Sequence, residues 1–528
     1  MAAKSTYEFG KSVVPEWSPQ PDWIDISSVA DNEINLLVCD WGVSAIGLAC
    51  TIAAAGTYSI DWGDGTVETG RASTTTYTHT YTVGTGTACS LGYTTFKVRI
   101  YGATGNITAF AMKQNADAST QTPQASTVLW AVFGTTALTT VANAFYSTTV
   151  YCQLLQSVTF PATMNSLSSM ANCFLSCTGL RHIEMPTSAT GITTLAASFQ
   201  SCLALRSIRL PPIMNSLTDM TSTFYECRDL VRVVMPTSAD TLSLINATFY
   251  GCTALESLDF PTDITTITTF VSAFTGCYRI RSIVLPTTLN SLTSMSSMCY
   301  NCMSLEEITM PTSMTGLTTL AQAFYQCMNL YTVSLPTTLA SLTTMASTFA
   351  YCYLLADITL PTANSLATMT STFLNCRGLL TVTLPATLGA VTDASTCFSG
   401  CYSLNTITNL SGLGKTTTAG CNGTDFLFGC QMLTTISLAA WWSKISCYGA
   451  SGKLNKVTSL RLTNASSTFA GASAQVDVRY CDLGAAALDT LFGDLPTLVG
   501  KTINITGCTG SATSTKTLAS DKGWTVVG

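Results

Sequence analysis

The fold is decided by the 25-residue stretch CMSLEEITMPTSMTGLTTLAQAFYQ, residues 302–326, which recurs with variations along the chain. Its first half carries Ile308 and Met310 in the alternation of a strand, and Pro311 then removes a backbone donor. In its second half, apolar residues fall at i, i+3, i+7 and i+10 from Leu317, a spacing that matches one face of a short helix. Each unit is therefore predicted to contain one short strand and one short helix.

Cysteines mark the period of this repeat. The chain has 22 cysteines, and eleven of them recur in a ladder with a single shorter spacing, between Cys352 and Cys376. A period of about 25 residues predicts a solenoid, in which each coil needs its neighbours to bury its apolar face. Parallel thiols about 4.8 Å apart suit a disulfide poorly, so we interpret them as small buried apolar residues. This structural ladder comprises Cys152, Cys177, Cys202, Cys227, Cys252, Cys277, Cys302, Cys327, Cys352, Cys376 and Cys401.

The repeat resembles a known family. The pattern C-x-x-L-x-x-I-x-L-P, followed by S-L-T-x-M-x-x-x-F-x-x-C, is similar to the BspA-like leucine-rich repeats of bacterial surface and phage proteins over about residues 129–430. The resemblance implies a right-handed solenoid with one short strand per coil, and a role in interaction without catalysis. Cys299 departs from the pattern at a Phe position, and Phe145 comes four residues early relative to Cys152. The spacing breaks between Cys401 and Cys430, so the last coils are predicted to be irregular.

A different kind of domain precedes the repeats. YSIDWGDGT at residues 58–66, with YTHTYT and FKVRIY further on, reads as strand, tight turn, strand and strand. The W-G-D-G-T motif that begins at Trp62, with His79 and Tyr81, resembles the PKD-type immunoglobulin-like sandwich. That resemblance implies a spacer or adhesion module in which His79 is structural.

The predicted fold class is thus an α/β leucine-rich-repeat solenoid preceded by an all-β, Ig-like sandwich. Near the C-terminus, residues 485–492 read as a helix and Trp524 leads into a closing strand, as expected of a cap that shields the last coil. The predicted domains are an extended arm at 1–33, the sandwich at 34–105, a linker at 106–128, the repeats at 129–430, and irregular repeats with a cap at 431–528.

The predicted arm contains the segment PEWSPQPDWIDISSV, residues 15–29, which is too rich in proline to be helical throughout. One interpretation is a docking strap that inserts Trp17 or Trp23 into a partner. The other is a segment packed on its own sandwich. The W-x-P-x-P-x-W lead-in before a DWGDG sandwich resembles segments of phage virion proteins.

Most charges of the repeats fall four, five and seven residues after the cysteines, at outward positions that flank a buried Ile or Val. This stripe is either a polar binding surface for a protein or glycan, or a solvated sheet face whose charges prevent aggregation. A second column, Tyr225, Tyr250, Tyr300 and Tyr325, is interpreted as either a sugar-stacking row or the packed flank of a helix. The stripe comprises Arg181, His182, Glu184, Arg206, Arg209, Arg232, Glu256, Asp259, Arg281, Glu306 and Glu307.

Composition excludes several classes of function. Charged residues make up 10% of the chain, the net charge is −6, and there are two histidines, so we expect no nucleic-acid partner, metal, cofactor or catalytic residue. Cys299 and Cys302 form a lone CxxC, which we interpret as buried and not zinc-binding. Cys177 lies in the buried ladder and is not expected to act as a nucleophile. Adjacent Glu306 and Glu307 point apart on a strand, unlike a hydrolase pair.

The sequence thus favours a non-enzymatic virion structural protein of a bacteriophage, either a capsid decoration or a tail-associated component. Its expected partners are other virion proteins, with a host-surface glycan or protein as a further candidate, and several copies per particle. Residues 1–8 read MAAKSTYE without an apolar stretch behind them, so we expect no export signal, assembly in the host cytoplasm, and no membrane insertion. The alternative is a bacterial cell-surface adhesin.

Overall fold

The computed structural model describes residues 17–40, 46–102, 105–113, 127–147, 150–261, 264–386, 388–413, 421–439, 442–448, 455–463 and 475–528. The chain divides into two compact units. The first comprises Met1–Ile192, Ala197–Ile213 and Cys227–Pro236, and the second comprises Thr193–Ala196, Met214–Glu226 and Thr237–Gly528.

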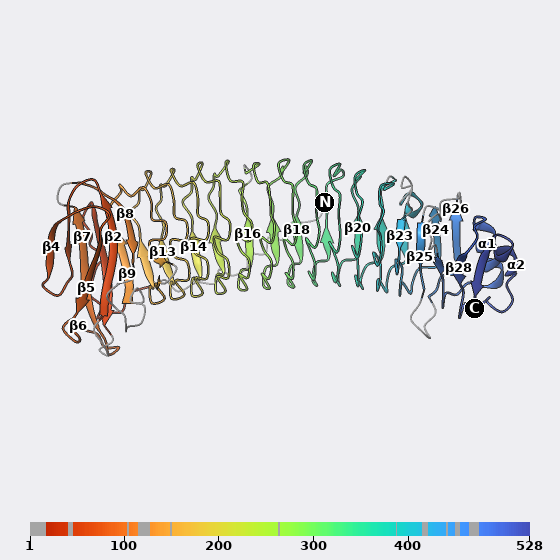
Figure 1. Ribbon diagram of the computed structural model, residues 1–528, viewed down its shortest axis with the longest axis horizontal. Helices are drawn as coiled ribbons and strands as arrows, with labels where there is room; N and C mark the ends of the chain where they lie inside the picture. The colour runs from red at the N-terminus through yellow and green to blue at the C-terminus, as the bar shows by residue number, and fades with distance from the viewer. Residues whose placement is uncertain are drawn as a thin grey trace, which may run out of the picture. The chain divides into compact units, whose positions relative to one another are not determined.

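The first unit contains an eight-stranded mixed sheet (Figure 1). Its strands follow the order β13 (His182–Glu184), β12 (Ser157–Thr159), β9 (Val128–Phe133), β1 (Glu33–Asp40), β7 (Thr94–Gly102), β3 (Tyr58–Asp61) and β4 (Val67–Arg71), with β6 (Thr87–Ala88) paired to β7. Strand β9 is antiparallel to β1 and parallel to β12. The sheet therefore continues from the N-terminal strands into the first coils, and β1 covers the edge that the first coil strand would otherwise expose.

A second, antiparallel sheet in this unit consists of β5 (Thr76–Tyr81), β2 (Ile46–Ala54) and β8 (Ile107–Met112). The two sheets pack through aromatic side chains, since the ring centroids of Tyr81 and Phe96 lie 4.2 Å apart and those of Phe110 and Phe133 lie 5.8 Å apart. Residues 107–112 of the predicted linker instead form β8, a strand of this sheet that buries Ile107, Phe110 and Met112. The immunoglobulin-like class of these sheets stays a prediction.

The W-G-D-G-T motif closes the turn between β3 and β4. The Trp62 N–H donates to the Thr66 carbonyl at 3.0 Å, and Gly63 adopts a φ of +83°. A Cβ at Gly63 would lie 2.4 Å from the Lys97 carbonyl oxygen, so the turn requires glycine there. The Tyr81 hydroxyl donates to the Trp62 carbonyl at 3.0 Å, which ties β5 to the turn.

Two smaller pairs complete the first unit. Strands β10 (Tyr146–Ser147) and β11 (Val150–Tyr151) form an antiparallel hairpin, and β14 (Ser207–Arg209) pairs in parallel with β15 (Arg232–Val234). The latter register joins Ile208 to Val233, equivalent positions of successive coils, as the repeat predicts.

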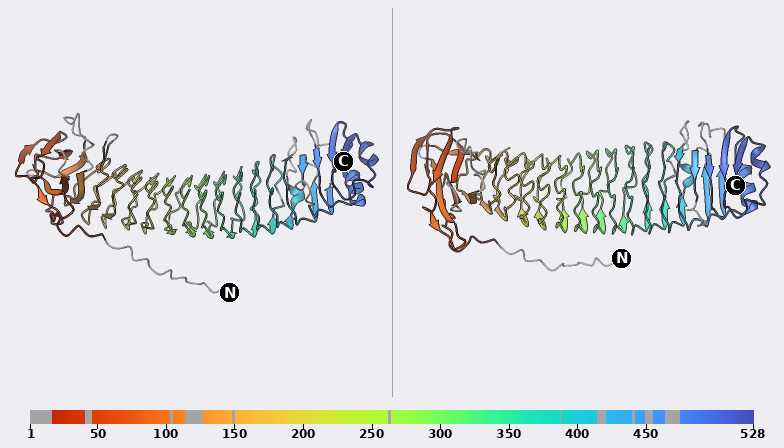
Figure 2. Two further views of the ribbon diagram at one scale, coloured as in Figure 1. Left: turned by 90° about the horizontal axis from the view of Figure 1, so that it is seen from below. Right: turned by 60° about the horizontal axis from the view of Figure 1, so that its bottom comes forward.

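In the second unit, successive coils contribute parallel strands, which both views of Figure 2 show as neighbouring rungs. The register aligns equivalent positions, for example Ile283 with Ile308 and Ile308 with Val333. The coil strands are β16 (Ser257–Asp259), β17 (Ser282–Val284), β18 (Glu307–Thr309) and β19 (Thr332–Val333), then β20 (Asp357–Thr359), β21 (Thr381–Thr383) and β22 (Thr406–Thr408), and finally β24 (Thr435–Ala439) paired with β26 (Ser459–Thr463).

The short helix predicted for each coil is wrong. In the repeat at residues 302–326, the segment after Leu317 is a run of turns. The Ala323 N–H bonds within its own coil to the Leu320 carbonyl at 3.0 Å, whereas the Gln322 N–H bonds to the next coil, to Ala346 at 2.9 Å. Gln322 itself has a φ of +57°, which no α-helix contains. Because turns can place apolar residues inward at the same intervals as a helix, the spacing of these residues in the sequence does not distinguish a short helix from a run of turns.

The C-terminal part of the second unit differs from the regular coils. A parallel sheet runs in the order β23 (Cys421–Gly423), β25 (Trp442–Ser446), β27 (Gln475–Asp477), β28 (Lys501–Asn504) and β29 (Trp524–Val527), beside the helices α1 (Ala485–Asp494) and α2 (Thr517–Ser520) and the 3-10 turn η2 (Leu410–Gly412). The helix and the closing strand lie where the sequence predicts them. Helix α1 is fixed to β26 because Asp494 accepts two hydrogen bonds from the Arg461 guanidinium, at 2.7 and 3.1 Å.

Candidate functional site

The cysteine ladder lies in the interior of the coils. All 22 cysteines are buried and outside disulfides, and each of the eleven ladder thiols has no exposed surface. From Cys202 onward, each ladder thiol donates to a backbone carbonyl in the preceding coil, most often that of a phenylalanine. For example, Cys277 Sγ lies 3.1 Å from the Phe249 oxygen, and Cys352 Sγ lies 3.1 Å from the Phe324 oxygen. The thiols are therefore both packing groups and hydrogen-bond donors between coils.

Burial raises the pKa of these thiols. The pKa values of Cys277, Cys327 and Cys352 lie well above the ordinary value of 9.0 because the thiolate would be desolvated. A buried thiol that stays protonated is neither a nucleophile nor a metal ligand. Among the residues that the structure describes, no group of histidine, cysteine and carboxylate side chains is arranged to hold a metal ion.

Each of the two histidines stacks on a tryptophan ring. The His182 ring is half-buried and stacks on Trp17, with centroids 5.7 Å apart and an angle of 7° between the planes. The His79 Nε2 lies 2.7 Å from Asp64 Oδ2, and its ring stacks on Trp62 at 4.9 Å. His79 therefore belongs to the turn of the W-G-D-G-T motif.

The tryptophans of the predicted arm pack against their own chain. Trp23 is 7% exposed, and its Nε1 donates to the Tyr93 hydroxyl at 2.8 Å. Trp17 is half-buried, with its ring centroid 6.5 Å from that of Trp23 and 5.6 Å from that of Trp130. Of the two interpretations, the structure places the tryptophans in the second, packed on the N-terminal sheets. Residues 1–16 of the predicted arm lie outside the described part of the chain.

The predicted charge stripe lies at the flanks of the coil strands. In the first unit, Arg181, Glu184, Arg206, Arg209 and Arg232 are exposed, on either side of buried strand centres. This part of the stripe is mostly basic, with four arginines against one glutamate among these five residues. The geometry of the stripe follows the sequence prediction, and whether it binds a partner stays a prediction.

In the second unit, the stripe is mostly acidic. Glu256, Asp259 and Glu307 are exposed, and Arg281 Nη1 lies 3.7 Å from Glu306 Oε1 in the next coil. The Arg281 and Glu306 side chains are 60% and 46% exposed, so water screens their attraction and the pair adds little stability. Glu306 thus contacts Arg281 of the preceding coil, while Glu307 is the exposed first residue of β18.

The tyrosine column forms stacks between coils, and not the flank of a helix. The rings of Tyr225 and Tyr250 lie 4.6 Å apart at 6°, and those of Tyr300 and Tyr325 lie 4.7 Å apart at 7°. Within each pair, the ring faces cover one another. Sequence reasoning found this column but missed its arginine counterpart: the Arg377 guanidinium carbon lies 5.1 Å from the Tyr353 ring centre and 5.8 Å from that of Tyr402.

A cavity of about 290 Å³ lies where the coil period breaks. The strand β22 ends one parallel sheet and β24 begins another, and η2 lies between them in the sequence. The sequence signal for this break was the longer spacing between Cys401 and Cys430. The lining residues carry no charge, and they are Ile407, Asn409, Leu410, Ser411, Leu433, Thr435, Ile436 and Ser437.

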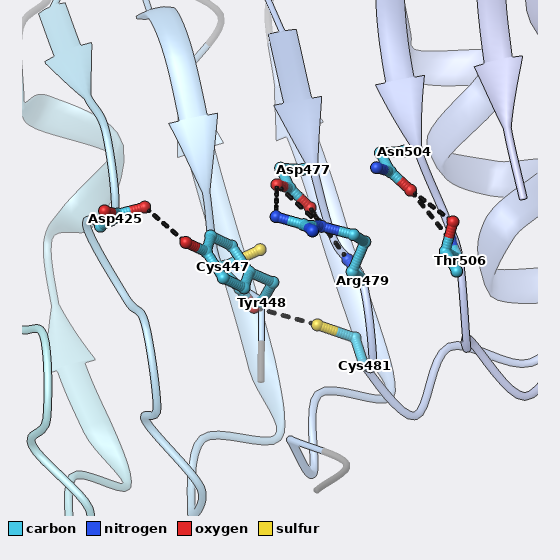
Figure 3. A network of polar contacts seen from close by, with 8 residues as sticks. All are labelled: Asp425, Cys447, Tyr448, Asp477, Arg479, Cys481, Asn504 and Thr506. Atoms are coloured by element: carbon cyan, nitrogen blue, oxygen red, sulfur yellow. Dashed lines mark hydrogen bonds and ion pairs between the residues drawn. The ribbon is translucent and has the colours of Figure 1, made fainter. Parts of the chain in front are cut away.

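Polar side chains connect the last coils, as Figure 3 shows. The Tyr448 hydroxyl donates to Asp425 Oδ1 at 2.9 Å, and the Arg479 guanidinium donates to both oxygens of Asp477. Arg479 also covers the Tyr448 ring, 4.6 Å from its centre. Burial raises the pKa of Tyr448 to about 12, so the phenol stays a donor to Asp425. We interpret this network as structural, since each polar group is satisfied by a neighbour.

Parallel strands that recur once in every coil, joined by turns around an apolar interior, define a leucine-rich-repeat solenoid. The chain belongs to the BspA-type leucine-rich-repeat family. The profile described as "BspA type Leucine rich repeat region" matches in six copies over residues 139–267, 195–321 and 296–426, which together span more than half of the 528 residues.

Several solved structures are similar to the chain at low sequence identity. A leucine-rich repeat protein from Bacteroides ovatus is 16% identical, and the match covers 71% of this chain and 90% of that protein with a TM-score of 0.38. A leucine rich cell surface protein from Faecalibacterium prausnitzii is 18% identical, with coverage of 58% and 84% and a TM-score of 0.31. The pneumococcal vaccine antigen PcpA is 14% identical, with coverage of 77% and 94% and a TM-score of 0.32.

These TM-scores are low, and the family assignment rests on the repeat profile. No curated protein sequence matches the chain. Within the described residues, none of the helices has the length and apolar character needed to cross a bilayer.

Proposed function

We propose that the protein is a non-enzymatic interaction protein whose stacked coils serve as a binding scaffold. The observation that carries this proposal is the division of each coil between a buried interior of unreactive thiols and strand flanks that present charged side chains to solvent. A repeat array of this kind offers an extended, preformed surface, and within the described residues it contains no assembled acid, base or nucleophile. Membership of the BspA-type family supports the same role.

We further propose that this scaffold is a structural component of a bacteriophage virion, either a capsid decoration or a tail-associated protein present in several copies. Support comes from the resemblance of the W-x-P-x-P-x-W lead-in and the DWGDG turn to segments of phage virion proteins. The N-terminal part would attach to other virion proteins, and the repeats would face the surroundings, where a host glycan or protein is the candidate ligand. The alternative setting is a bacterial cell surface, which the family resemblance accommodates equally.

The structure changes one part of this proposal. Because Trp23 is buried in the chain's own core and Trp17 packs beside it, we do not propose that either tryptophan inserts into a partner. Attachment is therefore proposed for the outer surface of the N-terminal sheets, with the tryptophans holding the segment from Trp17 to Ile26 against β1 and β9.

The location of the protein tests whether it belongs to a phage particle or to a bacterial cell surface. Antibodies raised against the repeats should label purified phage particles in negative-stain images, and quantitative mass spectrometry of those particles should give more than one copy per particle. A truncated chain that lacks the N-terminal sheets should be absent from the particles. Labelling of bacterial envelopes, with particles free of the protein, would replace this proposal by the adhesin.

A further inference from the structure

The tyrosine row of the second unit is interrupted at one coil. The position two before the ladder cysteine holds Tyr225, Tyr250, Tyr300 and Tyr325, but the coil between Tyr250 and Tyr300 carries Thr275. Tyr225 and Tyr250 stack nearly parallel, as do Tyr300 and Tyr325. The second face of Tyr250 and the second face of Tyr300 are therefore both directed toward the coil of Thr275.

The interval between these two faces matches one flat group. Two coil steps separate Tyr250 from Tyr300, which is about 10 Å at the strand spacing of roughly 4.8 Å per coil. A planar group midway would lie about 5 Å from each ring, within the range of stacked aromatic contacts. Thr275 does not fill this position, because its side chain is short and its Oγ1 donates to the Ser297 carbonyl at 2.7 Å. Beside the row, Gly251 and Gly276 contribute no side chains.

Elsewhere in the same unit, a planar side chain does lie between two tyrosine rings that are two coils apart. Tyr353, Arg377 and Tyr402 occupy the position after the cysteine in three successive coils. The Arg377 guanidinium carbon lies 5.1 Å from one ring centre and 5.8 Å from the other, so two tyrosines two coils apart hold a planar cation between them. Arg479 over Tyr448, at 4.6 Å, repeats the preference for guanidinium on tyrosine in this chain.

We propose that the interval between Tyr250 and Tyr300 receives an arginine side chain of a protein partner, which takes the place that Arg377 takes in its own row. The net charge of −6 favours a basic partner surface over an acidic one. The guanidinium is flat and stacks on ring faces, whereas a lysine ammonium is compact and does not, so the position prefers arginine to lysine. This inference goes beyond the proposed function and holds whether or not the chain is part of a virion.

The test uses the full chain with isotope-labelled tyrosine rings and NMR titration. Signals of Tyr250 and Tyr300 are assigned from the variants Tyr250→Phe and Tyr300→Phe. The probes are N-acetyl-arginine amide, N-acetyl-lysine amide and methyl glucoside. The expected result is a saturable shift of both ring signals with the arginine probe, at least about tenfold weaker binding of the lysine probe, and no shift with the glucoside.

Two variants make the result specific. Thr275→Arg should fill the interval from within and abolish the arginine-induced shifts, whereas Ser291→Arg, which adds the same charge at an exposed position of the next coil, should leave them unchanged. If Thr275→Arg does not fold, Tyr300→Leu removes one of the two faces and should weaken arginine binding at least threefold. The inference is overturned by equal shifts from arginine and lysine, by shifts from the glucoside alone, by the absence of any shift, or by binding that survives Thr275→Arg or Tyr300→Leu.

Discussion

The buried thiols make a specific prediction about alkaline pH, which Cys352→Ala tests. The Cys352 thiol has no exposed surface and donates to the Phe324 carbonyl at 3.1 Å. That carbonyl also accepts the Cys327 N–H at 3.2 Å, so the alanine variant leaves no orphaned acceptor. At pH 7 the variant should therefore lose only the sulfur packing and one weak hydrogen bond, about 1–2 kcal/mol in the free energy of unfolding.

The difference should shrink as pH rises. In the folded protein, burial keeps the pKa of Cys352 well above the ordinary 9.0, whereas the unfolded chain ionises near that value. The stabilisation from the protonated thiol is thus fully present below pH 9 and is lost as pH climbs toward the folded pKa. At pH 10, ionisation of the unfolded thiol costs the wild type about 1.4 kcal/mol relative to pH 8, a cost that the alanine variant does not carry. The variant should then be within about 1 kcal/mol of the wild type.

The assay is denaturant unfolding followed by circular dichroism in a phosphine reductant, at pH 7, 8, 9 and 10. Leu355→Val is the matched control, because Leu355 is equally buried in the same coil and carries no titratable group. Its destabilisation, about 1 kcal/mol, should stay constant across the series. A Cys352→Ala difference that stays constant or grows between pH 8 and pH 10 would refute the assignment of this thiol as a buried, protonated donor.

Four further predictions follow from other parts of the molecule. A native-state titration with an aromatic disulfide reagent should modify almost none of the 22 cysteines, and the same titration in urea should modify all of them. Rapid reaction of many cysteines in the folded protein would contradict their burial. Gly63→Ala should destabilise the N-terminal sheets by more than about 3 kcal/mol, because its Cβ would meet the Lys97 carbonyl at 2.4 Å, whereas Gly65→Ala, with similar φ and open space, should cost about 1 kcal/mol in thermal unfolding. Burial raises the pKa of Asp64, but the hydrogen bonds from His79 and Thr66 outweigh burial, so the net pKa is lowered. The stability that this carboxylate contributes is therefore present above its ordinary pKa of 3.8 and is lost as pH falls further. Asp64→Asn should flatten the acid side of the plot of stability against pH, and an unchanged plot would argue against the Asp64–His79 pair. A double-mutant cycle on Arg281 and Glu306 should give a coupling below about 0.5 kcal/mol, and a value several times larger would mean that the pair is less hydrated than its exposure indicates.

The repeat could be predicted from sequence because its signal is periodic. The same positions of successive coils, such as Ile283 and Ile308, must face the interior, so the strand register follows directly from the cysteine spacing. The outward placement of Arg206 and Glu256 follows from the same alternation. A shift of the strand register by one residue would have moved all of the buried side chains to the exposed face of the strands.

The second half of each coil could not be predicted in the same way. The apolar spacing after Leu317 is common to a short helix and to a chain of turns, and the left-handed residue Gln322 carries no signature such as glycine. The hydrogen bond from each thiol to a carbonyl of the preceding coil is likewise invisible, since it depends on how one coil lies on the next. Trp23 contacts Tyr93, which is distant in the sequence. The composition of the segment around Trp23 could not predict whether this tryptophan packs on its own chain or inserts into a partner.

The stacked coils bury thiols that donate hydrogen bonds to backbone carbonyls of the preceding coil. Raman spectroscopy of the native protein observes both sulfur species at once. Buried, hydrogen-bonded thiols should give a strong S–H stretching band, displaced toward the frequency of hydrogen-bonded thiols, that does not change when reductant is added, and the spectrum should contain no S–S band. An S–S band, or an S–H band at the frequency of unbonded thiols, would contradict this arrangement.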